Sequence, residues 1–242
     1  MLQKKLLRFT WAALIIFGFH ATAAQGARLT FSSFEGSPGQ EMSALILKEA
    51  YASIGIEVEV IRYPGLRSLK TANEGGVDGE LSRVKAFERD YPNLILVPVP
   101  VNQLQGTAFS KNGGLELRGW ESLRGYTIGI TRGMKFAERG TDGMAIVRAN
   151  SHEQLFQLLD KGRVDVAINP FVNGVAIIKK LKLEGIHSLE PPLVRVDLYH
   201  FLHKRHAALV PKITDSIRKL EASGRIDEIR KQFFQDIAEA PS

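Results

Sequence analysis

The chain has 242 residues, 44% of them hydrophobic, so it is long enough to form one large domain or two modest ones around a substantial core. Its formal net charge is +6 at pH 7 without any basic block, which argues against nucleic acid as a partner. It contains no cysteine, which excludes disulfide bonds and a lipid-anchored cysteine.

The first 23 residues have the three parts of a secretory signal peptide. Lys4, Lys5 and Arg8 precede an apolar run over residues 9–19, and small residues follow over 21–24. The apolar run is too short to span a bilayer comfortably. We therefore predict a cleaved signal peptide over residues 1–23 and a soluble protein of a Gram-negative periplasm, with an uncleaved membrane anchor as the alternative.

The first half of the remaining chain alternates strand and helix patterns. Apolar residues at helical spacing, ended by Gly55, predict the first helix, and alternating charged and β-branched residues predict the strand after it. The resulting β-α-β-α-β order predicts a mostly parallel sheet. The predicted strands span residues 28–34, 57–61 and 77–81, and the predicted helices span residues 40–54 and 66–73.

The second half begins with an apolar stretch, residues 94–101, that contains Pro98 and Pro100. Proline has no N–H to donate to a central ladder, so we predict that this stretch is an edge strand or leaves the first half of the fold. The strands predicted after it span residues 107–109, 126–130, 146–148, 164–168 and 194–203, and the helices span 134–139, 151–162, 171–183, 211–224 and 226–233.

Two junctions between a helix and a strand share a short pattern. Gly-Gly-Val-Asp occupies residues 75–78 and Gly-Arg-Val-Asp occupies residues 162–165, and each leads directly into a predicted strand. The repetition agrees with the doubled order of strands and helices and predicts two similar α/β lobes.

Glu80, Ser82 and Arg83 stand where the strand over 77–81 ends. Ligands of open α/β sheets bind at strand ends, so a carboxylate, a hydroxyl and a guanidinium gathered there indicate a site for a small polar ligand. The alternative is a solvated turn whose charges pair with one another.

The order of elements resembles the periplasmic solute-binding proteins of the polar amino acid type, the extracellular component of ABC importers. The stretches that carry the resemblance are residues 120–130 (WESLRGYTIGI), residues 155–168 and residues 220–233 (LEASGRIDEIRKQF). The resemblance implies an α/β, type II periplasmic-binding-protein fold, in which two lobes, each a mostly parallel sheet flanked by helices, are joined by two strand-like hinges. It divides the chain into lobe one over 28–101, lobe two over 102–196, and a return to lobe one over 197–236 with the C-terminal helices.

The resemblance also implies residues that hold the ligand. In the family an arginine grips the ligand carboxylate, a role that falls on Arg83 or Arg89, and Arg83 is favoured because it lies closer to the strand end. Residues 131–135 are similar to the family's loop at a helix start, where backbone N–H groups receive an anion. Thr131 and Gly133 are the expected contacts in this loop.

The chain departs from the family pattern in two places. Asn169 replaces the acidic residue that usually meets the ligand ammonium, and the aromatic and proline cluster after the first strand is reduced to residues 34–38. Glu35 or Glu80 would then take the ammonium, or the ligand lacks one.

Three aromatic residues, Tyr63, Phe109 and Phe171, are candidates for stacking on the ligand, with a place in the core as the alternative. The histidines show no spacing typical of a metal site, and neither a phosphate loop nor a nucleophile elbow is present. We therefore predict no metal and no cofactor.

These patterns predict a monomeric binding protein and not an enzyme. We expect it to bind a small-molecule ligand, an amino acid or related small carboxylate, by hinge closure and to deliver it to the membrane permease of an ABC importer. A membrane sensor is an alternative partner, because it would respond to the same closure.

A periplasmic dehydratase of the prephenate or arogenate type is an alternative function, in which Glu80 would be the general acid once burial raises its pKa. We expect Arg83→Ala to leave folding nearly intact and to weaken binding about ten-fold or more.

Overall fold

The computed structural model describes residues 27–64 and 66–239, so the predicted signal peptide lies outside the described residues. None of the helices in this described part is long and apolar enough to cross a membrane. In chain order the elements are β1 (Ala27–Phe34), α1 (Pro38–Ala52), β2 (Ile56–Tyr63), α2 (Arg67–Asn73), β3 (Gly79–Val84), η1 (Lys85–Arg89), β4 (Leu94–Ser110), η2 (Trp120–Leu123), β5 (Ile128–Thr131), α3 (Lys135–Gly140), β6 (Ile146–Ala149), α4 (His152–Asp160), β7 (Val166–Pro170), α5 (Phe171–Lys180), β8 (His187–Ser188), β9 (Val194–His203), η3 (Lys204–Leu209), α6 (Val210–Ala222) and α7 (Arg225–Glu239).

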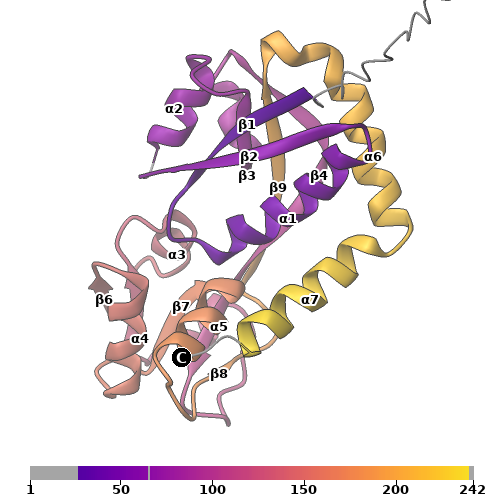
Figure 1. Cartoon of the computed structure of the whole chain (residues 1–242). Helices are drawn as coiled ribbons and strands as arrows, with labels where there is room; N and C mark the ends of the chain where they lie inside the picture. The colour runs from indigo at the N-terminus through magenta and orange to yellow at the C-terminus, as the bar shows by residue number, and fades with distance from the viewer. Residues whose placement is uncertain (1–26, 65, 240–242) are drawn as a thin grey trace, which may run out of the picture.

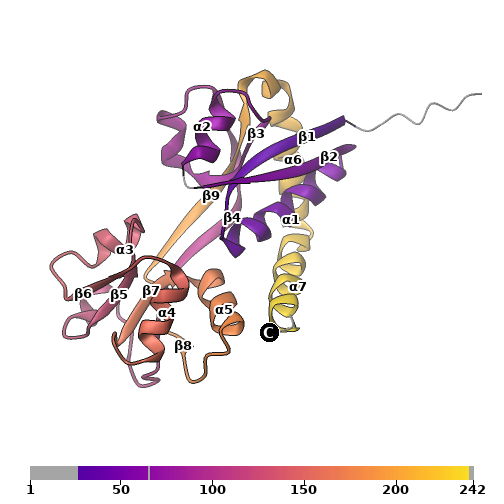
Figure 2. The same ribbon diagram turned by 60° about the vertical axis from the view of Figure 1, so that its left-hand side comes forward.

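The described strands form one nine-stranded sheet in the order β2-β1-β3-β9-β4-β7-β5-β6, with β8 paired to β4. Strands β1, β2 and β3 run parallel in lobe one, and β5, β6 and β7 run parallel in lobe two. Strands β4 and β9 pair antiparallel and pass from one lobe to the other, as Figures 1 and 2 show at the waist of the molecule. The molecule is therefore an α/β protein of two lobes.

The lobe limits that the sequence suggested, near residues 101 and 196, fall inside β4 and β9. Along β4, Val101 packs in a core cluster of lobe one, whereas Ala108 packs in a core cluster of lobe two. One continuous strand thus contributes to both cores.

Helix α1 covers one face of the lobe-one sheet. Its buried face includes Ile46, Leu47 and Tyr51, which pack in one cluster with residues of β1, β3, α6 and α7. Gly55 adopts φ = 76°, a left-handed conformation open to glycine, and so ends this helical segment before β2. On the opposite face, α2 packs through Leu69 into a separate cluster with Phe201 of β9.

Strand β4 is one strand of 17 residues, where the sequence predicted separate pieces over 94–101 and 107–109. In lobe one its only partner among the described strands is β9, so the predicted edge position is confirmed. The pairing with β9 shifts register between Leu96 and Asn102, around Pro98 and Pro100. Because proline has no amide hydrogen, the ladder with β9 is interrupted within lobe one, whereas the pairing is regular from Asn102 to Gly106, where β4 passes to lobe two.

Lobe two buries both faces of its parallel strands. Along β7, Val166 and Ile168 pack in the cluster beneath η2 and α3, while Ala167 packs in the cluster beneath α4 and α5. Successive strand residues point to opposite faces, so this division requires helices on both sides. Ser151 caps α4 by accepting a hydrogen bond from Gln154 N at 3.1 Å, so the helix begins at the predicted position.

The repeated Gly-x-Val-Asp pattern makes the same contacts in both lobes. In lobe one, Asp78 N donates to Thr30 O and Asp78 Oδ2 accepts from Thr30 N, both at 2.8 Å. In lobe two, Asp165 N donates to Thr127 O at 2.8 Å and Asp165 Oδ2 accepts from Thr127 N at 2.7 Å. Each aspartate therefore joins the start of β3 or β7 to the strand beside it, β1 or β5.

Candidate functional site

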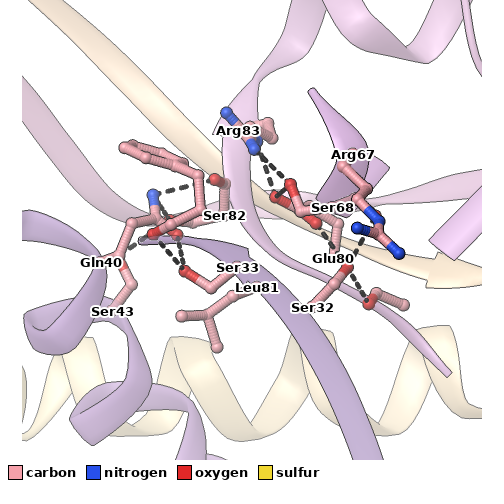
Figure 3. Close-up of polar contacts among 12 residues, drawn as sticks. Ser32, Ser33, Gln40, Ser43, Arg67, Ser68, Glu80, Leu81, Ser82 and Arg83 are labelled. Atoms are coloured by element: carbon pink, nitrogen blue, oxygen red, sulfur yellow. Dashed lines mark hydrogen bonds and ion pairs between the residues drawn. The ribbon is translucent and has the colours of Figure 1, made fainter. Parts of the chain in front are cut away.

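Glu80 lies at the centre of a buried polar cluster in lobe one. Its side chain is 0% exposed, and its Oε1 accepts hydrogen bonds from Arg83 Nε at 2.6 Å and from Ser68 Oγ at 3.2 Å. Its Oε2 accepts from Ser32 Oγ at 2.5 Å. Figure 3 shows these side chains gathered together. The charges of Glu80 and Arg83 pair, but they do so in the interior of the lobe and not in a solvated turn.

A bulge in β3 brings Glu80 and Arg83 together. Both residues lie within β3, which runs to Val84, and not beyond a strand that ends at residue 81. Residues three apart in a regular strand point to opposite faces. The pairing with β9 shifts register between Glu80 and Arg83, and this irregularity returns the arginine to the face of the carboxylate. At Gly79, a Cβ would lie 2.2 Å from a β9 carbonyl oxygen, so the bulge begins where only glycine fits.

Arg83 is held from three directions. Its Nη2 donates to Ser68 Oγ at 2.5 Å, and its guanidinium carbon lies 4.4 Å from the centre of the Phe34 ring. Burial raises the pKa of Glu80, and the charge of Arg83 with the hydroxyls of Ser32 and Ser68 opposes that rise. The Arg83 side chain keeps 11% of its surface exposed, so part of it can be reached from solvent.

Ser82 belongs to a second polar network, which joins β3 to α1. Its Oγ accepts from Gln40 Nε2 at 2.9 Å and donates to Ser43 Oγ at 3.0 Å. Asn102 of β4 donates from Nδ2 to Ser43 Oγ and to Gly39 O, both at 3.1 Å. The hydroxyl of Ser82 is thus used within the protein, where it holds the start of α1 against β3, while Asn102 holds the same part of α1 against β4.

His200 of β9 supports β3 from within the core. It is 0% exposed, its Nδ1 donates to Glu80 O at 2.9 Å, and its Nε2 accepts from Tyr51 Oη at 2.9 Å. Since carbonyl oxygens can only accept, Nδ1 carries the hydrogen of the ring. Burial lowers the pKa of His200 to about 4. This histidine is therefore neutral in the folded protein at neutral pH.

Three other predicted site residues lie outside the Glu80 cluster. Arg89 is 86% exposed and its Nε donates to neighbouring Asp90 Oδ1 at 3.2 Å, so the structure separates it from Glu80. Glu35 is exposed after β1, and its backbone N–H donates to the carbonyl of Tyr63, at the end of β2, at 3.1 Å. The structure thus brings Glu35 and Tyr63 side by side at the ends of neighbouring strands.

In lobe two, Thr131 and Asn169 converge on a histidine that the sequence did not single out. They lie at the carboxyl ends of β5 and β7, and His152 Nδ1 is 3.0 Å from Thr131 Oγ1 and 3.2 Å from Asn169 Nδ2. With both neighbours donating, Nδ1 accepts and Nε2 carries the hydrogen. Burial lowers the pKa of His152, which keeps the ring neutral. Among the described residues, Asn169 Oδ1 is the one buried side-chain polar atom without a hydrogen-bond partner.

The remaining predicted contacts of lobe two are engaged by the chain itself. The backbone N–H of Gly133 donates to Glu138 Oε1 at 3.0 Å. Phe109 is 0% exposed and packs against Phe156, with ring centres 5.1 Å apart, so it occupies the core. The ring of Phe171 lies 5.7 Å from that of Phe234 on α7. The described residues contain no group of three or more histidine, aspartate or glutamate side chains that could hold a metal ion.

Comparisons with known proteins identify the fold. No protein-family model matches the chain. An uncharacterized protein of Shewanella oneidensis is 27% identical over 210 residues, which cover 81% of this chain and 78% of that protein. The ligand-binding core of GluR0 in complex with L-glutamate superposes with a TM-score of 0.71 at 13% identity, covering 87% of this chain and 99% of that one.

Two further solved structures have the same architecture. An amino acid ABC transporter substrate-binding protein of Streptococcus pneumoniae, AbpA bound to L-arginine, gives a TM-score of 0.67 at 15% identity over 88% of this chain and 97% of that one. A histidine kinase sensor domain with similarity to periplasmic binding proteins gives 0.65 at 18% identity over 85% and 95%. These similarities confirm the two-lobed fold that the sequence predicted.

Proposed function

We propose that this chain, which has the two-lobed fold of the periplasmic binding proteins, binds a small polar ligand between its lobes and closes over it. The main support for the proposal is that each lobe has one polar cluster, and that β4 and β9 connect the two lobes. Glu80 and Arg83 stand in lobe one, and Thr131 and Asn169 stand at the strand ends of lobe two. Strand ends of α/β sheets are where such ligands bind.

Closure would bend β4 and its partner β9 between Val101, which packs in the lobe-one core, and Ala108, which packs in the lobe-two core. Asn173 of α5 in lobe two supports this view, because its Oδ1 accepts from Gly39 N, near the start of α1 in lobe one, at 3.4 Å. Asn102 holds the same turn of α1 from the strand between the lobes. A change in the angle between the lobes would therefore act directly on the helix that borders the lobe-one cluster.

The partner we propose is the permease of an ABC importer, with the protein working as a periplasmic monomer. The sensor alternative is favoured by one observation, the similarity to a histidine kinase sensor domain. The two partners are distinguished by deleting the gene: loss of uptake of the bound ligand supports the importer, whereas intact uptake with loss of a transcriptional response supports the sensor.

We propose binding without catalysis. A dehydratase would need Glu80 to reach the leaving hydroxyl of its substrate. The Glu80 side chain is 0% exposed, and both of its oxygens are held by Arg83, Ser68 and Ser32. A carboxyl group enclosed in this way is better suited to holding Arg83 in place.

The test is a thermal-shift screen of the purified protein against amino acids, small carboxylates, polyamines, sugars and amides, followed by X-ray scattering with any hit. A ligand that binds only the folded state raises the melting midpoint. We expect at least one class to do so and to reduce the radius of gyration. If no class shifts the midpoint or compacts the molecule, the proposal of ligand-driven closure is wrong.

A further inference from the structure

The two places where the sequence predicted contact with a ligand carboxylate already hold carboxylates of the chain. In lobe one, Glu80 Oε1 lies 2.6 Å from Arg83 Nε. In lobe two, Glu138 Oε1 accepts from Gly133 N at 3.0 Å, and its Oε2 lies 3.0 Å from Lys135 Nζ. The chain thus supplies, at both positions, the group that a ligand acid was expected to bring.

The pair in lobe one is unfavourable for a second carboxylate. Glu80 is 0% exposed and Arg83 only 11% exposed, so the pair is a buried unit without net charge. A ligand carboxylate beside Arg83 would add a negative charge next to a guanidinium whose own charge Glu80 already balances. It could otherwise displace Glu80, which would then lose Arg83 while still enclosed. Either outcome leaves a poorly compensated anion in a poorly solvated place, and that is costly.

Lobe two is equally unsuited to an ammonium. The position that is acidic in the resembling family is Asn169, which carries no charge, and its side chain contacts the neutral ring of His152. What Asn169 offers is a buried Oδ1 that lacks a partner, and such an acceptor is completed by an uncharged N–H or O–H donor, which needs no counter-charge. His152 Nε2–H adds a donor to the same cluster, and no partner for it is found among the described residues.

We propose that the ligand is an uncharged polar molecule, carrying N–H or O–H donors together with carbonyl or hydroxyl acceptors, as an amide or a polyol does. This inference rests on the proposed function and narrows its ligand class. Lobe two gives neutral hydrogen bonds through Asn169 and His152, and lobe one gives the outer edge of a guanidinium whose charge Glu80 already balances.

The test compares ligands of similar size and shape that differ in charge. Succinate is paired with succinamide, and galacturonate with galactose, and L-glutamate and L-arginine serve as charged amino acids. Melting midpoints and calorimetric affinities are measured on the whole secreted protein. We expect a neutral member to bind at least ten-fold more tightly than its acid. Tighter binding of an acid or an amino acid overturns the inference but keeps the proposed function, while the absence of binding and of compaction with every compound rejects both.

A charge-removing variant gives an independent outcome. Glu80→Gln keeps the shape of the side chain and leaves the charge of Arg83 unbalanced, so the variant should gain at least ten-fold in affinity for the acid of each pair. Glu41→Gln is the matched control, because Glu41 pairs with Arg62 on the exposed surface of lobe one and should change nothing. Glu138→Gln, at a partly exposed site, repeats the test in lobe two if Glu80→Gln fails to fold. A folded Glu80→Gln protein without this gain contradicts the inference.

Discussion

The two lobes share a backbone frame and differ in the chemistry placed on it. Asp78 and Asp165 join a strand to its neighbour through the same two hydrogen bonds, one from the aspartate backbone N–H and one to its side-chain Oδ2, with Thr30 in lobe one and Thr127 in lobe two. The short repeat seen in the sequence is therefore a repeat of structure, in which a side chain of fixed length completes the start of a parallel strand. That role depends on position in the sheet and not on what the lobe binds.

Beyond this frame the lobes diverge. Lobe one encloses a charged pair, Glu80 and Arg83, supported by two serine hydroxyls, while lobe two encloses neutral Thr131, His152 and Asn169. The comparison shows that one architecture can present either a buried charge or a neutral hydrogen-bonding group at its strand ends. Function must therefore be argued from each cluster separately.

The charged cluster should be the more sensitive to substitution, and Arg83→Ala should have the largest effect. Removing the guanidinium leaves Glu80 buried without its counter-charge, which costs about 3–5 kcal/mol of unfolding free energy. This revises the expectation from sequence that folding would be nearly intact. Urea denaturation measures the change. Exposed Arg89→Ala is the control, expected within about 0.5 kcal/mol of the parent. Equal effects of the two substitutions would mean that the pair with Glu80 is not important for folding.

Lobe one should also respond to acid through His200. The folded pKa of about 4 lies below that of the unfolded chain, about 6.5, so the unfolded state takes up the proton first as the pH falls. The contribution of His200 to the free energy of unfolding is about 3 kcal/mol above about pH 6.5. It is lost progressively as the pH falls toward 4.

Urea denaturation at a series of pH values tests this dependence. His200→Gln should flatten the curve between about pH 6.5 and 4, whereas replacing exposed His187 with Gln should leave its shape unchanged. A parent protein whose stability is constant across this range would contradict a neutral, buried His200.

The smallest expected effects are at the two repeated aspartates, and they should differ between the lobes. Asp165→Ala removes the bond to Thr127 N and should cost about 1 kcal/mol. Asp78→Ala removes the equivalent bond and also the contacts of Oδ1 with Arg205 and His206, both at 2.7 Å, and should cost about 2 kcal/mol. Chemical denaturation of the two variants side by side gives the difference. A larger loss for Asp165→Ala would reverse the comparison.

The sequence predicted most of the helices and strands because local residue patterns determine where they begin and end. The strand predicted over 194–203 has the bounds of β9, and the helix predicted over 151–162 contains α4. It failed on β4, where Pro98 and Pro100 break the strand pattern. Pairing with β9 on either side of the irregular stretch keeps that strand continuous, and such long-range pairing leaves no local signal.

The site was harder to predict because its contacts join distant residues. The sequence favoured Arg83 over Arg89 for the ligand carboxylate, and that role stays a prediction. The bulge in β3 brings Arg83 to Glu80, a contact that no local pattern indicated. His152 was missed because its neighbours in the cluster, Thr131 and Asn169, lie on two other elements. Its position after the cap residue Ser151, at the start of a helix, was the one available hint.

The place of β9 in the sheet also affects the order of events as the chain is synthesised. Strand β3 borders β1 on one side and β9 on the other, and β9 follows the whole of the segment that carries β5, β6 and β7. Lobe two can therefore assemble from one continuous stretch before β9 is available, and until then the edge of β3 that pairs with β9 is unpaired. Closing so long a loop is slow, and an open strand edge invites pairing with other chains. We expect lobe one to finish folding last, and the edge of β3 to be the surface most in need of a chaperone until then.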